Sequence, residues 1–512
     1  MASAVSPAFI EGIGVASNMV DKLNHMIDIV NHIFATTINV SAPHSSATGR
    51  SNDMSDSLRA SDIAYHIHSQ TNLSVHEQVG PVVMERGEGI YTWDTNGKRY
   101  LDAMSGMWSA SLGYSESRLE QAALKQMKQL PYHQNFAHRS TEPAILLAER
   151  LIELAPVPMS KVLFACSGSE ALDTAIKLAW YYWSAKGQPQ RRKIISRNRA
   201  YHGTTIASAS LTGLGHLHQD FGLPLPGFLH VTCPHYYREG QTGETEEAFS
   251  TRLADELEAL IQREGPDTIA AFFAEPVMGT GGVITPPAGY FEKIQAVLKR
   301  HDVLLVADEV INGFGRTGNW WGCQTYGVKP DMLTCAKALS ASYMPISALL
   351  ISEPIFQAMK NQSEKIGVFG HGFTYGGHPI AAAVALECLN IYQERQLPAH
   401  AAKVGERLGA GLRKLADHPL VGEVRGAGLM WGVELVANKA DKTPFPREWK
   451  VGLLASQQTE ANGVTARALN DSVVFAPPLI ITEAEVDEVL EAFAKGLDAA
   501  LDILRSQSRF DG

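Results

Sequence analysis

Apolar and polar positions change their spacing repeatedly along the chain, and these changes mark out the predicted elements. Between about residue 115 and residue 350, stretches with helical spacing alternate with short apolar runs that predict buried strands. These runs cover residues 161–165, 193–196, 268–274, 303–307 and 332–336. Helices that alternate with buried strands are typical of a mostly parallel sheet with crossover helices. The pattern therefore predicts an α/β fold with a large domain over residues 115–350.

Segments on both sides of this region predict a smaller α/β domain. Residues 90–101 predict a hairpin, because strand-forming arms flank Asn96-Gly97, a pair that accepts the positive φ angles of a tight turn. Further on come an alanine-rich helical stretch at 380–415, strands at 421–425 and 429–435, and a last helix at 483–504. We expect residues 61–114 and 351–512 to form this small domain.

The first 60 residues differ from the rest of the chain. Residues 19–34 predict a short amphipathic helix, and residues 41–57, rich in Ser and Asn, predict a linker, so we expect ordered structure to begin near Asp62. The segment lacks the basic start of a secretory signal, and three acidic residues precede its first arginine, unlike a mitochondrial presequence. We interpret residues 1–60 as an extension of unknown role. The sequence favours a cytoplasmic location and leaves organellar targeting open.

Composition narrows the possible functions. A chain of 512 residues is too long for one core, and a net charge of −10 gives no basic surface for nucleic acid. No apolar run reaches the length of a membrane span. The five cysteines are scattered and lack CxxC spacing, so they indicate neither a disulfide framework nor a zinc site, and no metal is expected. A reducing compartment fits this pattern best.

Lys337 directly follows the apolar run at 332–336. Burial disfavours the charged form of a lysine, so the pKa of Lys337 should fall from about 10.4 toward neutrality. A neutral amine is a nucleophile that can form a Schiff base with a carbonyl, and pyridoxal phosphate is the usual partner. The alternative is that Lys337 begins the next helix and extends its charged end into solvent.

A second strand end predicts an anion site. Ser167, Gly168 and Ser169 turn from the strand at 161–165 into a helix. Free N–H groups, small residues and hydroxyls at a helix N-terminus bind anions such as phosphate. A plain serine N-cap is the more common meaning of such a turn.

Three further strand ends carry residues that suit a cofactor. Tyr201 follows the strand at 193–196, where its ring could stack on a flat cofactor or simply pack. Glu275 stands before Pro276 and could orient a hydrogen-bond network or lie in a surface turn. Asp308 ends an apolar strand and needs a cationic partner, which a protonated pyridine nitrogen supplies in pyridoxal enzymes. A helix cap or a structural ion pair is the alternative for Asp308.

All these residues fall at the carboxyl ends of strands, where open parallel sheets bind ligands. Together they supply the parts of a pyridoxal phosphate site. Residues 308–318, Lys329-Pro-Asp331 and Ala336-Lys337 resemble the signature of class III aminotransferases, which belong to fold type I of the pyridoxal phosphate enzymes. The resemblance covers the chain from about residue 62 to its end. Relatives often have glycines after the lysine, where this chain has Ala338 to Tyr343.

The resemblance implies roles for the residues around the cofactor ring. Lys337 would hold pyridoxal phosphate as a Schiff base and then move the proton between substrate and cofactor. Asp308 would pair with the pyridine nitrogen, Val310 would pack on the ring, and Tyr201 would stack on it. Glu275 would support the surrounding hydrogen-bond network.

The resemblance also implies how the phosphate is held. Ser167, Gly168 and Ser169 would bind it, and His202 with Gly203 would shape the loop that carries Tyr201. Thr374, within residues 370–379, resembles the residue that reaches the phosphate of the partner subunit. The implied assembly is a homodimer, or a dimer of dimers, with shared active sites.

The acceptor is suggested by the run from Glu275 to Thr280. Relatives that use 2-oxoglutarate resemble Glu-Pro-Ile-Gln-Gly-Glu there, whereas this chain has Met278 and Thr280. This resembles the branch that uses pyruvate with omega-amino acids, 4-aminobutyrate or amines. Arg467 matches the arginine that binds the acceptor carboxylate in that branch, a task that suits a permanently charged, bidentate guanidinium. A surface arginine is the alternative, and Asn470 stands where relatives often have glycine.

Trp108 matches an aromatic wall of the substrate pocket in the same branch, and Phe136 would line the pocket too. The resemblance thus implies a transaminase that passes nitrogen from an omega-amino acid or amine to pyruvate, a 2-oxo acid, by a ping-pong mechanism. The alternatives are a 2-oxoglutarate-dependent transaminase, an aminomutase, racemase or decarboxylase on the same fold, and a non-catalytic relative. The donor stays open among 4-aminobutyrate, β-alanine, a polyamine and an arylamine.

Overall fold

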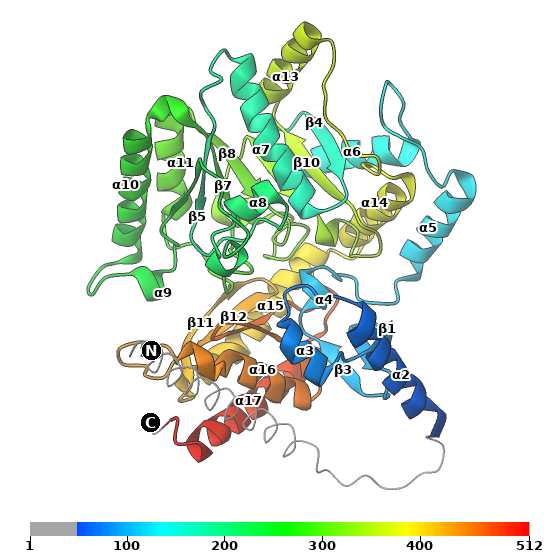
Figure 1. Ribbon diagram of the computed structural model, residues 1–512, viewed down its shortest axis with the longest axis vertical. Helices are drawn as coiled ribbons and strands as arrows, with labels where there is room; N and C mark the ends of the chain where they lie inside the picture. Colours follow the sequence, from blue (N-terminus) through cyan, green and yellow to red (C-terminus); the bar gives the residue numbers. More distant parts are fainter. Residues whose placement is uncertain (1–48, 511–512) are drawn as a thin grey trace, which may run out of the picture. The chain divides into compact units, whose positions relative to one another are not determined.

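The computed structural model describes residues 49–510, with side chains from residue 55 onward (Figure 1). The chain forms two compact units, Met1–Val83 and Met84–Gly512, and each is described by itself. The helix predicted at 19–34 lies outside the described residues.

The described part of the first unit consists of helices α2 (Gly49–Tyr65) and α3 (Leu73–Val79). Arg59 of α2 donates hydrogen bonds to the carbonyls of Val79, at 2.6 Å, and Pro81. Because α2 begins at Gly49, the prediction of a linker at 41–57 is wrong for residues 49–57. Contacts with α3 outweigh the weak helix propensity of a Ser- and Asn-rich segment.

The second unit is built on a seven-stranded sheet with the order β4-β10-β9-β8-β7-β5-β6. Six strands run parallel, and β10 pairs antiparallel with both β9 and β4. The mostly parallel sheet and its five predicted strands are confirmed, whereas β6 and β10 were not predicted. The strands are β4 (Lys161–Ala165), β5 (Lys193–Arg197), β6 (Phe228–Val231), β7 (Ile269–Ala274), β8 (Leu304–Asp308), β9 (Met332–Cys335) and β10 (Ser347–Ile351).

Helices cover both faces of this sheet, as its continuous apolar strands require. Phe272 and Phe273 are neighbours in β7 but pack into two different hydrophobic clusters. One cluster contains side chains of α7, and the other contains those of α10 and α11, which lie side by side (Figure 1). The helices from residue 105 to 366 are α4 (Ser105–Trp108), α5 (Ser117–Gln129), α6 (Glu142–Leu154), α7 (Gly168–Ala185), α8 (Ile206–Leu211), α9 (Tyr236–Glu239), α10 (Glu246–Glu264), α11 (Tyr290–Arg300), α12 (Gly322–Tyr326) and α13 (Glu353–Ile366).

The helical stretch predicted at 380–415 is two helices, α14 (Pro379–Glu394) and α15 (Leu397–Lys414). The break falls at Gln396, whose φ angle of 50° is incompatible with a continuous right-handed helix, and Pro398 follows it. The predicted helical stretch is therefore confirmed, and the break within it was not predicted.

Two smaller sheets join distant parts of the second unit. One has the order β1-β2-β3-β13 and contains the predicted hairpin, with Gly97 at a φ angle of 80° in its turn. The other has the order β11-β12-β15-β14. Because β13 pairs with β3, segments near both ends of this unit share a sheet. The elements are β1 (Met84–Glu88), β2 (Tyr91–Asp94), β3 (Arg99–Asp102), β11 (Val421–Ala427), β12 (Met430–Leu435), α16 (Val451–Ala461), β13 (Val464–Thr465), β14 (Arg467–Leu469), β15 (Ser472–Phe475) and α17 (Glu483–Ser506).

The predicted domain boundaries near residues 60, 114 and 350 stay a prediction. Across residues 49–510, no helix is both long and apolar enough to cross a membrane.

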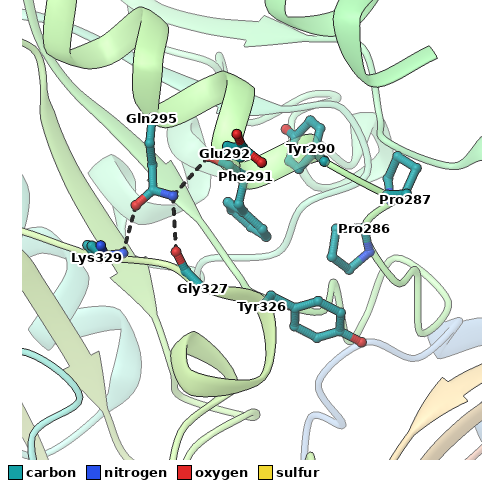
Figure 2. Close-up of a pocket in the computed structure, with 11 residues that line it drawn as sticks. Pro286, Pro287, Tyr290, Phe291, Glu292, Gln295, Tyr326, Gly327 and Lys329 are labelled. Carbon is teal, nitrogen blue, oxygen red and sulfur yellow. Dashed lines mark hydrogen bonds between the residues drawn. The ribbon is translucent and has the colours of Figure 1, made fainter. Parts of the chain in front are cut away.

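A cavity of about 700 Å³ lies beside the start of α11 and the end of α12 (Figure 2). The side chain of Gln295 joins its walls, donating to the carbonyls of Phe291 and Gly327 and accepting from the N–H of Lys329. None of the site residues predicted from the sequence lines this cavity.

Candidate active site

Lys337 lies just beyond the end of β9, at the first position of a short 3-10 turn, and its side chain is half-buried. Its φ angle of 50° is rare for a residue other than glycine and is a sign of backbone strain. Burial lowers the pKa of Lys337 to about 8, against the opposing effect of the Asp308 and Glu275 charges. Within the described chain, the lysine nitrogen makes no hydrogen bond or ion pair, so it is free to react.

Asp308 is the last residue of β8, and it is buried. One of its oxygens accepts a hydrogen bond from the N–H of Val310 at 3.0 Å, and the other lies 2.8 Å from Nδ1 of His202. The N–H of buried His202 donates to the hydroxyl of Thr212 at 2.8 Å. The sequence assigned His202 only to the shape of its loop; the structure adds a direct contact that fixes the carboxylate.

The start of α7 offers donors for an anion. Ser167 is the N-cap, and its hydroxyl accepts from the N–H of Glu170 at 3.2 Å, as the alternative reading expected. The N–H groups of Gly168 and Ser169 have no hydrogen-bond partner among the described residues. A Cβ atom at Gly168 would lie 3.1 Å from both methyl groups of Val310. Glycine therefore allows the helix start to lie directly against Val310.

The loop that carries Tyr201 packs tightly on this helix start. Gly203 has a φ angle of 133°, and a Cβ atom there would lie 2.4 Å from the hydroxyl of Ser169. That hydroxyl accepts a hydrogen bond from the N–H of Thr204 at 3.1 Å. The side chain of Tyr201 is half-buried. The structure thus brings the predicted phosphate residues and the predicted ring-stacking residue together.

Glu275 is buried rather than placed in a surface turn. Its carboxylate accepts from the N–H of Tyr201 at 3.1 Å and from the N–H of Gly279 at 2.9 Å, and burial raises its pKa. Its backbone carbonyl accepts from the guanidinium of Arg197 at 2.7 Å. Arg197 was not singled out in the sequence, because its partner lies 78 residues away.

Trp108 ends a turn in which Ser105, Gly106 and Trp108 all have positive φ angles. The indole ring of Trp108 is buried, and the indole N–H has no hydrogen-bond partner within residues 49–510. Arg316 supports this turn by donating to the hydroxyl of Ser105 at 3.1 Å and to the carbonyl of Leu429 at 3.0 Å. Burial lowers the pKa of Arg316 to about 10. Arg316 lies within the family signature at residues 308–318, but no role was predicted for it.

Arg467 lies in β14 and is half-buried. Its guanidinium contacts the sulfur of Met107, a neighbour of Trp108 that was also not predicted. Burial raises the pKa of Tyr201 and lowers that of Lys337, and the positive charge of Arg467 has a smaller, lowering effect on both pKa values. Arg467 is therefore close enough to act on both residues.

Phe136 and Thr374 make contacts with other parts of the chain. The exposed Phe136 ring lies against Gly372, where a Cβ atom would be 2.9 Å away. Thr374 is also exposed, and its carbonyl accepts from the hydroxyl of Tyr132 at 2.8 Å. In the described part of the chain, neither residue makes a hydrogen bond or ion pair with those around Lys337.

The fold and these residues define an α/β enzyme site with one free amine, one fixed carboxylate and an open helix N-terminus. A family model, Aminotransferase class-III, matches residues 73–497. The chain belongs to the class-III aminotransferases, which use pyridoxal phosphate and have fold type I.

The similar proteins are named as transaminases. The chain is 49% identical over 433 residues to gamma aminobutyrate transaminase 3, chloroplastic, of Solanum lycopersicum, covering 84% of this chain and 83% of that one. It is 52% identical, with a TM-score of 0.86, to the omega transaminase from Pseudomonas jessenii in complex with PMP, covering 87% of this chain and 98% of that one. A solved transaminase with L-alanine is 56% identical, with a TM-score of 0.81, covering 82% of this chain and all of that one.

Proposed function

We propose that this aminotransferase binds pyridoxal phosphate at Lys337 and moves an amino group from an omega-amino acid or amine to pyruvate. The observation that carries the proposal is the arrangement of three side chains. The free amine of Lys337 lies within the electrostatic influence of the Asp308 carboxylate and of Arg467, a guanidinium with no acidic partner in the described chain.

The residues present fit the cofactor. The unpaired N–H groups at the start of α7 suit its phosphate, and the contacts at Gly168 and Gly203 leave no room for a larger residue on that side. Val310 and Tyr201 would hold the ring, and Asp308 its pyridine nitrogen. Bound there, pyridoxal phosphate supplies an electron sink for the bond electrons released when the substrate carbon loses its proton.

The chain's own residues would position and move the proton. With a pKa of about 8, about 1 in 10 Lys337 side chains is neutral at pH 7, against about 1 in 3,000 at the ordinary value. A neutral Lys337 can act as a general base, accepting the proton of the substrate carbon at Nζ. It can then act as a general acid and donate this proton to a neighbouring atom. His202 and the N–H of Val310 hold the Asp308 carboxylate in one orientation.

Pyruvate is supported as the acceptor by the surroundings of Arg467. Within residues 49–510, no carboxylate pairs with Arg467, and Thr280 stands at the position of the second glutamate in the Glu-Pro-Ile-Gln-Gly-Glu pattern of relatives that use 2-oxoglutarate. The guanidinium can therefore bind an acceptor carboxylate without first releasing an internal acid. The similar structure with L-alanine, the amino acid that pyruvate yields, fits this choice.

The names of the similar proteins support the donor class. One is a gamma-aminobutyrate transaminase and another an omega transaminase, so both names point to an amine remote from any carboxylate. We propose 4-aminobutyrate, β-alanine or a simple amine as donors.

A donor panel with each of two acceptors tests the proposal. The purified enzyme is incubated with each donor and either pyruvate or 2-oxoglutarate, and alanine and glutamate are quantified. We expect alanine with at least one omega-amino acid or amine, and little glutamate. Glutamate as the main product would contradict the acceptor, and product formation without any acceptor would favour an aminomutase, racemase or decarboxylase.

Replacing Arg467 with alanine should weaken the binding of the acceptor more than the binding of the donor. Loss of a charge-assisted hydrogen bond, worth roughly 1.5–3 kcal/mol, should raise the KM for pyruvate by about 10- to 150-fold. The KM for an amine donor without a carboxylate should stay within about threefold of native. The matched control is R263A, which removes an exposed arginine of α10. Equal effects on pyruvate and on the plain amine would contradict the role of Arg467.

The reactivity of Lys337 should follow its lowered pKa. Uptake of pyridoxal phosphate by the cofactor-free chain needs the neutral amine, so its initial rate should rise about tenfold per pH unit below pH 8 and level off above it. Stopped-flow absorbance measures this rate. A rate that keeps rising in the same way toward pH 10 would show an ordinary lysine.

We propose a homodimer, with Thr374 reaching the site of the partner subunit. Several apolar side chains close in sequence to Phe136 or Thr374 are exposed in the single chain, namely Tyr132, Ile366, Val368 and Tyr375. Exposed apolar side chains that gather on one surface are typical of a subunit interface. Sedimentation of the holoenzyme should give at least twice the mass of one chain, and a fully active monomer would contradict the role of Thr374.

We propose a cytoplasmic location. All five cysteines lie in the described residues and are free, which fits a reducing compartment. Microscopy of the full chain fused to a fluorescent protein at its C-terminus tests this, and import into an organelle would contradict it.

A further inference from the structure

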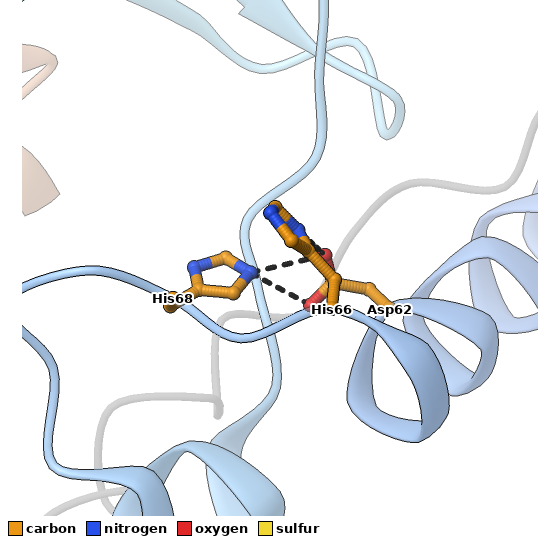
Figure 3. A group of neighbouring side chains, drawn as sticks. All are labelled: Asp62, His66 and His68. Carbon is orange, nitrogen blue, oxygen red and sulfur yellow. Dashed lines mark hydrogen bonds and ion pairs between the residues drawn. The ribbon is translucent and has the colours of Figure 1, made fainter.

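Three histidines and one aspartate converge in the first unit, where α2 ends and α3 follows. Asp62 lies in the last turn of α2, His66 and His68 lie just beyond the helix, and His76 lies in α3. The chain has 18 histidines in total, and three of them lie within the eleven positions from residue 66 to residue 76. Figure 3 shows the rings of His66 and His68 both turned toward the Asp62 carboxylate.

Each imidazole points one ring nitrogen at the same carboxylate. Nδ1 of His66 lies 3.0 Å from Asp62, and Nε2 of His76 also lies 3.0 Å from it. Nε2 of His68 lies 2.9 Å from one oxygen and 3.0 Å from the other. The ring centroids of His68 and His76 are 4.1 Å apart, and those of His66 and His68 are 4.7 Å apart.

We propose that Asp62, His66 and His68, with His76 as a fourth ligand, form a binding site for a divalent transition-metal ion, with zinc as the best match. Zinc takes imidazole nitrogens and carboxylate oxygens in tetrahedral geometry. Bonds of about 2.0–2.1 Å from zinc to each ligand place neighbouring ligand atoms of a tetrahedron about 3.4 Å apart. One ligand atom from each of Asp62, His66 and His68 already lies within 4.8 Å of the others.

The ligands are held in place by contacts outside the cluster. Arg59, one turn before Asp62 in α2, donates to the carbonyl of Val79, the last residue of α3, and to that of Pro81 just beyond it. Asn72 caps the start of α3 by accepting from the N–H of Val75 at 3.2 Å. An ion would thus join two helices whose positions are already fixed, so little ordering free energy is lost on binding.

The site is reachable from solvent on one side. The side chain of His66 is 67% exposed, whereas those of His68 and His76 are 29% and 9% exposed. An ion could enter beside His66 and be enclosed by the other ligands. Four protein ligands leave no open position for substrate, so the ion would stabilise the α2–α3 segment rather than catalyse a reaction.

The second close group of possible ligands in the described residues does not suit an ion. His235, Glu423 and Glu434 also lie together. However, Arg425 pairs with both glutamates, at 2.5 and 2.8 Å, and Arg238 pairs with Glu434 at 2.5 Å. Those carboxylates are already neutralised. Among residues 59–80, by contrast, no ion pair joins Asp62 to a lysine or arginine.

Zinc titration of the full-length holoenzyme tests the proposal. The enzyme is treated with a chelator, desalted and titrated with zinc chloride against a chromophoric indicator. We expect one ion per chain at this site, and at least about tenfold weaker binding in H66A, H68A and D62N. The matched control is H216A, which removes an exposed histidine far along the sequence and should bind zinc like the native chain.

Cobalt provides a signature that a hydrogen-bonded cluster alone would not give. Addition of Co²⁺ to the native holoenzyme should produce the visible bands of tetrahedral coordination in a difference spectrum, and H68A should lack them. The exposed His66 makes H66A a variant that should fold even if H68A does not. Equal zinc affinity in native enzyme, H66A and H68A, or no cobalt bands in the native enzyme, would overturn the proposal.

Discussion

Replacing Lys337 with alanine is expected to lower the turnover number for transamination by at least about 1,000-fold. The variant loses both the amine that attaches the cofactor and the group that moves the proton. The lysine makes no hydrogen bond or ion pair within the described chain, so its removal leaves the surrounding contacts intact. Turnover with saturating donor and pyruvate measures the effect.

The matched control is K329A, which removes an exposed lysine eight positions earlier in the chain. It lines the separate cavity beside α11 and should retain native turnover. Far-ultraviolet circular dichroism of K337A should match that of the native enzyme. Turnover of K337A within tenfold of native would show that another amine performs the chemistry.

Replacing Asp308 with asparagine should lower turnover by about 100- to 1,000-fold, the usual effect of losing one preorganised electrostatic contact. Asparagine keeps the shape and can still accept from the N–H of Val310, but it lacks the negative charge that would keep the pyridine nitrogen protonated. The contact with His202 at 2.8 Å shows that the carboxylate is already oriented.

The control for D308N is D302N, an exposed aspartate just before β8. Cofactor content should be measured for both variants, so that a loss of turnover is separated from a loss of binding. The loss in D308N should persist when the site is saturated with pyridoxal phosphate. Native turnover in a fully loaded D308N would contradict the assignment.

Most of the central sheet could be predicted because its strands are short apolar runs buried on both faces. The same pattern located Lys337 and Asp308, since charged residues at the ends of such runs are rare without a partner. The strands β6 and β10 were missed, as were the first residues of α2 and the break at Gln396. The two strands and the start of α2 depend on contacts with distant segments rather than on local spacing, whereas the break at Gln396 is accompanied by Pro398, a local signal that the prediction did not use.

The supporting residues could not be predicted from the sequence. Arg197 and Arg316 act through backbone carbonyls 78 and 113 residues away, and nothing in their local sequence indicates this. Met107 contacts Arg467 only because β14 lies beside the turn at Trp108. Sequence reasoning identified the groups that would touch the cofactor, but it did not identify the residues that hold them.

The histidine cluster illustrates a different kind of omission. The prediction that no metal binds rests on cysteine spacing alone, although Asp62, His66 and His68 are spaced so that a helix end brings them together. The contribution of His76 depends on the packing of α3 against α2 and could not be read from spacing.

The most direct test of the central claim is to identify the residue that holds the cofactor. The purified holoenzyme is reduced with borohydride, which fixes pyridoxal phosphate to the amine that binds it, and the digested protein is analysed by mass spectrometry. The account predicts one modified peptide, with the phosphopyridoxyl group on Lys337. Modification of a different lysine, or none in an active enzyme, would contradict it.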